Sequence, residues 1–109
     1  MERIESTILK NLIHNEEYSR KSIPFLKAEY FEDRKEKVIF EEILSFIVKY
    51  DTSITVEALN IEVDNRTDLT DDELKGIKDT TTLLKESSVY QQWLLYSTEK
   101  WCRDRAIYL

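Results

Sequence analysis

The sequence predicts an all-α domain, and three observations support this class. The chain of 109 residues contains one glycine and one proline, whereas β-sandwiches and α/β folds use both residues at many tight turns. Apolar residues recur at spacings of three and four along most of the chain. Helix-capping patterns separate these apolar stretches. We therefore expect one domain over residues 1–109, folded as a compact orthogonal bundle of about six helices.

An apolar stripe predicts the first helix over residues 3–14. Asn15 is placed to cap a second, short helix. This helix must end before Pro24, because the residue that precedes a proline is pushed out of the α region. Residues 24–31 are therefore expected to be irregular or to form single turns, with their aromatic side chains lying under the core.

A longer helix follows, with Asp33 as its cap and an end near Asp51. Its apolar arc is wide, which indicates a central helix with neighbours on more than one side. The arc contains Ile39, Phe40, Ile43, Leu44, Phe46, Ile47, Val48 and Tyr50. Thr55 is placed to cap a short helix that precedes a polar loop at 64–69. The apolar residues expected on that short helix are Val56, Leu59, Ile61 and Val63.

Two further helices complete the predicted bundle. Thr70 and Glu73 match a capping box that opens a helix expected to run to about Glu86. Ser88 and Gln91 match a second capping box, which opens the last helix. No glycine, proline or polar tail ends that helix. We therefore expect the chain to be a fragment cut inside a helix of a longer protein.

The composition leaves little room for catalysis in this chain. A phosphate-binding loop needs several glycines, and Gly76 is the single glycine present. His14 and Cys102 are the two candidate zinc ligands, although a structural zinc site needs about four. We interpret His14 as a partner of carbonyls at a helix end and Cys102 as a packing residue. The acidic residues of 64–73 lack the spacing of a calcium loop, so we expect no catalytic site, no metal and no cofactor.

Charge and hydropathy argue against nucleic acid and membranes as the main partners. The net charge is −6, whereas phosphate binding depends on an excess of Lys and Arg. Residues 34–37 are basic but are interrupted by Glu36, so a solvated helix face is the preferred interpretation. No apolar run approaches the ~20 residues of a membrane span. The N-terminus shows no signal-peptide pattern and the single cysteine is consistent with a cytoplasmic setting.

The remaining candidate is a protein-contact surface on the last helix. That helix carries more aromatic residues than one buried stripe can easily hold in so small a domain, and such an excess is typical of contact surfaces. An entirely structural role in the core is an equally good interpretation. The aromatic residues are Tyr90, Trp93, Tyr96, Trp101 and Tyr108.

Several short motifs, in collinear order over nearly the whole chain, resemble a known family. The most specific are Glu29-Tyr30-Phe31, Ala58-Leu59-Asn60 and Arg103-Asp104-Arg105-Ala106. The others are Ile8-Leu9-Lys10-Asn11-Leu12-Ile13, Phe25-Leu26, Phe40-x-x-Ile43, Val48-x-Tyr50, Trp93-Leu94 and Thr98-Glu99-Lys100. Together they resemble the N-terminal domain of the DnaB-type replicative DNA helicases, and most of all the helicases of T-even-like bacteriophages.

This resemblance implies that residues 1–109 are the collar domain of a ring helicase. It also implies that the RecA-like ATPase domain, with its ATP and Mg²⁺, lies outside this chain. The implied partners are other helicase subunits, a primase and a helicase loader, all in the cytoplasm of the bacterial host. Such domains dimerise through a long helical hairpin, and the motif at 103–106 matches its first arm, so the last helix would be the start of a truncated hairpin. The candidate interaction residues are then Trp93, Tyr96, Trp101, Arg103, Arg105 and Tyr108.

A free-standing phage adaptor is the alternative hypothesis. Such a protein would bind a replication or host protein through a helical surface. A gene that ends at Leu109 would favour the adaptor. A reading frame that continues into a glycine-rich phosphate loop would favour the helicase.

Overall fold

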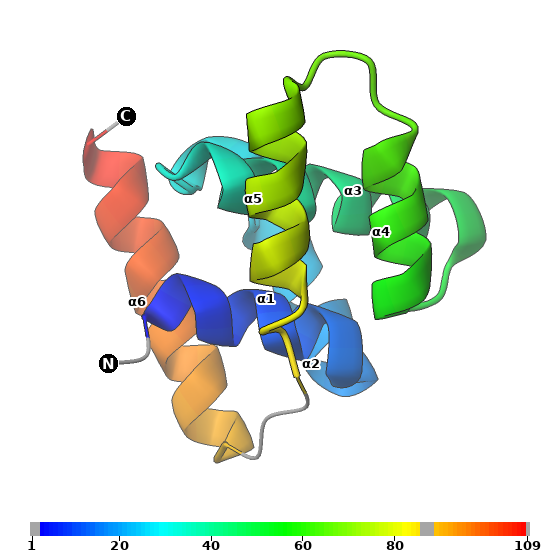
Figure 1. Cartoon of the computed structure of the whole chain (residues 1–109). Helices are drawn as coiled ribbons and strands as arrows, with labels where there is room; N and C mark the ends of the chain where they lie inside the picture. The colour runs from blue at the N-terminus through cyan, green and yellow to red at the C-terminus, as the bar shows by residue number, and fades with distance from the viewer. Residues whose placement is uncertain (1–2, 86–88, 109) are drawn as a thin grey trace.

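Helix α3 (Arg34–Tyr50) forms the centre of the molecule, and other elements pack around it (Figure 1). The computed structural model describes residues 3–85 and 89–108, and the regular structure within these residues is entirely helical. The remaining elements are α1 (Ile4–His14), α2 (Glu16–Ser22), the short 3₁₀ helices η1 (Ile23–Phe25) and η2 (Ala28–Tyr30), α4 (Val56–Asp64), α5 (Asp71–Thr81) and α6 (Gln91–Tyr108). Helices α1, α4 and α5 all contact α3, as its wide apolar arc predicts.

Helices α1 and α5 cross at a steep angle, and the predicted all-α bundle of about six helices is confirmed within the described residues. Figure 1 shows α4 and α5 side by side, with α1 passing across their direction. Helix α6 packs against α1, α2 and η2. The core takes side chains from all six α-helices of the described residues. Its fully buried members include Ile8, Leu9, Leu12, Tyr18, Phe31, Ile39, Phe40, Ile43, Leu59, Ile77 and Leu94.

Four helices begin at the N-cap residues that the sequence predicts. The N-cap residues are Asn15, Asp33, Thr55 and Thr70, and each accepts a hydrogen bond from a backbone N–H of the first turn. Thr70 and Glu73 make both hydrogen bonds of the capping box. Helix α3 ends at Tyr50, and its C-cap Asp51 has a φ of 54°, in the left-handed region that Asp tolerates better than most residues. The capping role predicted for Ser88 lies outside the described residues.

Helix α5 ends at Thr81, earlier than the predicted end near Glu86. The hydroxyls of Thr80, Thr81 and Thr82 each donate to a backbone carbonyl three or four residues earlier, an alternative to regular helical bonding. The carbonyl of Leu84 then accepts a hydrogen bond from His14 Nε2 at 2.9 Å. His14 therefore does contact a carbonyl, but on a segment 70 residues away instead of on its own helix.

Several apolar residues predicted for the core lie on the surface instead. Val48 and Tyr50 are exposed because the last turns of α3 extend beyond the helices that cover its middle. Ile61 is exposed because α4 buries Leu59 and Val63 on its opposite side. Phe25, one of the aromatic residues expected under the core, is also exposed. Within the described residues, no helix is both long enough and apolar enough to span a bilayer.

Replacing the capping residue of α5 should destabilise the fold. Thr70→Ala removes the hydroxyl that accepts from the Glu73 N–H at 3.1 Å, so the free energy of unfolding should fall by about 1 kcal/mol in urea titrations. Thr67→Ala, at an exposed loop position, is the matched control and should leave stability unchanged. An equal loss in both variants would show that the cap does not stabilise α5.

Candidate interaction surface on the last helix

The inner face of α6 is fixed in the core. The hydroxyl of Tyr18 lies 2.6 Å from Thr98 Oγ1, and both side chains are fully buried. The indole of Trp101 packs on the ring of Phe31, with centroids 5.0 Å apart, and meets the ring of Tyr30 edge-on at 6.1 Å. Aromatic pairs of this geometry stabilise beyond the area that they bury. Helix α6 is therefore held to the body of the domain along one side.

Burial also raises the pKa of two groups at this inner face. It raises the pKa of Tyr18 to about 12, against the opposing effect of the hydrogen bond to Thr98. It raises the pKa of the Cys102 thiol to about 11, with a smaller contribution from the negative charge of Glu99. A thiol with such a pKa is almost entirely protonated at neutral pH and is a poor nucleophile. The interpretation of Cys102 as a packing residue is confirmed, because its side chain lies within the core cluster.

The outer face of α6 carries large aromatic side chains in solvent. Trp93 is 50% exposed and Tyr96 is 63% exposed. Tyr90, just before the helix, is 70% exposed and its hydroxyl donates to Gln92. Tyr90, Trp93 and Tyr96 are three residues apart in sequence, and we call them the aromatic patch. Clustered exposed aromatic residues are typical of protein-contact sites.

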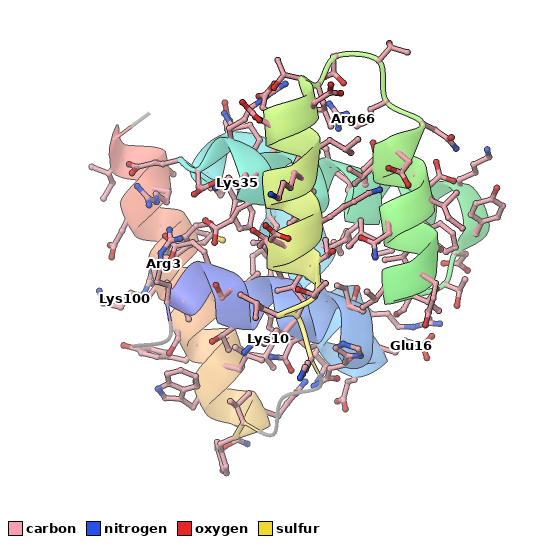
Figure 2. All side chains as sticks on the ribbon, in the orientation of Figure 1. Arg3, Lys10, Glu16, Lys35, Arg66 and Lys100 are labelled. Atoms are coloured by element: carbon pink, nitrogen blue, oxygen red, sulfur yellow. The ribbon has the colours of Figure 1, made fainter. Side chains whose placement is uncertain are left out.

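Charged residues continue this outer face beyond the aromatic patch. Lys100 pairs with Asp104 at 3.1 Å, and Arg103 lies 3.9 Å from Glu99. Both pairs are exposed, and pairs of this kind contribute little to stability. Their charges therefore remain open to solvent and can meet a charged partner. Figure 2 shows Lys100 on the side of the molecule where α1 begins.

The predicted interaction residues differ in their exposure. Trp93, Tyr96 and Arg103 are exposed. Trp101 is 9% exposed and packs in the core, so most of its indole is covered by the domain itself. Arg105 is only partly exposed and pairs within the molecule with Glu5. The side chain of Tyr108 lies outside the described part of the chain.

Arg105 belongs to a charge network that the sequence does not reveal. Its guanidinium pairs with Glu5 at 3.3 Å and with Glu32. Arg3 lies 3.4 Å from Glu5 and donates to Glu36 at 3.1 Å. Burial raises the pKa of Glu36, and the positive charge of Arg3 opposes this shift. The network connects the beginnings of α1 and α3 to the far half of α6.

A second ion-pair cluster fixes the loop between α4 and α5. Arg66 donates to Asp68 at 2.7 Å and also pairs with Glu41 and Glu42 on α3. The bond from Arg66 lowers the pKa of Asp68 to about 2. Figure 2 shows Arg66 near the ends of α4 and α5 that this loop joins. The described residues contain no group of three or more His, Cys, Asp and Glu side chains arranged to hold a metal ion.

The structure thus defines a small all-α domain whose last helix exposes large aromatic side chains. No family model matches the chain. The DnaB-like replicative helicase of Enterobacteria phage T4 is 33% identical to it over 101 residues, or 93% of the chain. The chain spans 21% of the length of that helicase. The predicted resemblance to the helicases of T-even-like phages is therefore confirmed, for a part of such a protein about the size of one domain.

The charge network should respond to pH through Glu36. Because burial raises its pKa, the folded state binds this proton more tightly than the unfolded state, so the contribution of Glu36 to stability decreases as pH rises above about 4.5. Lowering the pH from 7 to 5 should therefore stabilise the natural chain relative to Glu36→Gln, as measured by urea unfolding.

Glu57→Gln, at an exposed position on α4, is the control for this measurement. Its stability relative to the natural chain should not change over the same pH range. A natural chain that loses stability relative to Glu36→Gln on acidification would contradict the assignment.

Proposed function

We propose that this chain is the N-terminal collar domain of a phage replicative DNA helicase, acting through protein contacts in the cytoplasm of the bacterial host. The observation that carries the proposal is the identity of 33% to the phage T4 helicase across nearly the whole chain. A match that covers most of this chain but a fifth of the relative is what one domain of a larger enzyme produces. ATP and Mg²⁺ then belong to a RecA-like motor domain outside residues 1–109.

The division of α6 into two faces supports a role in protein contact. Its inner face is buried through Thr98 and Trp101, so the helix does not need a partner in order to fold onto the domain. The outer face nevertheless exposes Trp93 and Tyr96. Interfaces are enriched in Trp, Tyr and Arg, and Arg103 lies further along the same helix.

The proposed partners are other helicase subunits, the primase and the helicase loader. The net charge of −6 favours protein partners over nucleic acid for this domain. The aromatic patch supplies side chains that exclude water well at the centre of an interface. Of the two hypotheses, the match to a replicative helicase favours the collar domain over a free-standing adaptor.

Replacing two of the three residues of the aromatic patch should weaken these contacts. In the helicase that contains this chain, Trp93→Ser with Tyr96→Ser should reduce ring assembly, or binding to primase or loader, by at least about tenfold. Sedimentation measures the ring, and calorimetry with each purified partner measures binding. The thermal unfolding of the 109-residue chain should be little affected, because both side chains are exposed.

Val48→Ser with Ile61→Ser is the matched control. Both residues are exposed and apolar, but they lie on α3 and α4. This control should assemble and bind as the natural helicase does. If the Trp93 and Tyr96 variant retained every one of these contacts, the proposed contact role of α6 would be wrong.

A further inference from the structure

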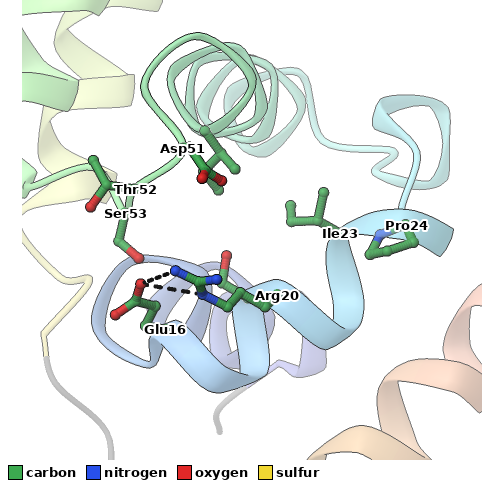
Figure 3. Close-up of a pocket in the computed structure, with 9 residues that line it drawn as sticks. Glu16, Arg20, Ile23, Pro24, Asp51, Thr52 and Ser53 are labelled. Carbon is green, nitrogen blue, oxygen red and sulfur yellow. Dashed lines mark hydrogen bonds and ion pairs between the residues drawn. The ribbon is translucent and has the colours of Figure 1, made fainter.

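A hollow of about 200 Å³ lies between α2, η1 and the C-terminal end of α3 (Figure 3). Ile23, Pro24 and Ile47 supply its apolar wall. Drug-sized ligands occupy pockets of about 300–1,000 Å³, so this hollow suits one large apolar side chain better than a whole cofactor. No residue of α6 lines it, and it is therefore separate from the aromatic patch.

The rim of the hollow carries a negative charge that is not fully compensated. Glu16 and Asp51 lie there with one cation, Arg20. Arg20 donates to Glu16 twice, at 2.7 Å and 3.3 Å, and its charge interacts more weakly with that of Asp51. Figure 3 shows Asp51 across the opening from Arg20. Within the described residues, the Asp51 side chain makes no hydrogen bond or ion pair. Two carboxylates thus face one guanidinium.

The end of α3 adds to this negative potential. Its last carbonyls lack partners within the helix, and the helix dipole places partial negative charge at this end. The basic residue of the last turn, Lys49, turns away toward the ring of Tyr50, with Nζ 5.3 Å from its centroid. Lys49 does not line the hollow. A cation from another molecule would therefore be attracted to the open side near Asp51.

We propose that this hollow binds a segment of a partner protein that carries a large apolar residue beside a Lys or Arg. The apolar side chain fills the space between Ile23 and Ile47, and the basic side chain pairs with Asp51. Thr52 and Ser53 also line the hollow, and their side chains can donate and accept hydrogen bonds. The apolar wall of the hollow packs against the large side chain of the segment. The negative charge at the rim favours basic over acidic sequences.

A titration followed by ¹H–¹⁵N NMR of the 109-residue chain tests the proposal. The probe is acetyl-Ala-Phe-Arg-Ala-amide. One control peptide has Glu in place of Arg, and the other has Ser in place of Phe. The probe should shift the amide signals of Ser19, Ile47 and Ser53 and should bind at least about fivefold more tightly than either control.

Two charge-matched variants separate the role of Asp51 from a general loss of acidity. Asp51→Asn retains a residue that tolerates the left-handed backbone and removes the charge, so affinity for the probe should fall about fivefold. Asp79→Asn, at an exposed position on α5, should bind as the natural chain does. The amide signals far from the hollow verify that both variants fold.

Three results would overturn the proposal: no shift at the three amides, equal binding of all three peptides, or unchanged affinity in Asp51→Asn. The Trp93 and Tyr96 variant should bind the probe normally. A failure of this proposal is therefore distinguishable from a failure of the collar role.

Discussion

The packing of Trp101 against Phe31 is the interaction on which the rest of the structure depends. Phe31 also stacks on Phe40 of the central helix, with ring centroids 5.1 Å apart. The three rings thus connect α6 to α3, although α6 otherwise packs on α1, α2 and η2. The buried bond between Tyr18 and Thr98 holds the same helix a turn earlier. Without these contacts the outer face of α6 would have no defined position.

Because one side of α6 is held against the domain, its exposed side has a defined position. A helix anchored by its own domain presents its exposed aromatic residues as a preformed surface, and a preformed surface loses less conformational entropy on binding. The proposed collar role rests on this exposed surface and on the similarity to one domain-sized part of a replicative helicase.

The sequence predicts those features of the fold that depend on neighbouring residues. The capping box of Thr70 and Glu73 involves groups three residues apart, and pattern alone finds it. The contact between His14 and the carbonyl of Leu84 joins groups 70 residues apart, so no local pattern predicts the path of the chain after α5.

In the candidate contact surface, too, the sequence does not predict features that depend on residues far apart in the chain. Trp93 and Trp101 stand on one helix, and the sequence does not show which of them the folded body covers. The pair of Glu5 and Arg105 joins residues 100 positions apart, so no local spacing predicts it.

The exposure of the two tryptophans tests the central claim most directly, because the chain contains no others. Trp93→Phe leaves Trp101 as the single fluorophore, and Trp101→Phe leaves Trp93. In the folded chain, acrylamide should quench Trp93 several-fold more strongly than Trp101, and denaturation in urea should remove the difference. Equal quenching of the two tryptophans in the folded chain would contradict the division of α6 into a buried and an exposed face.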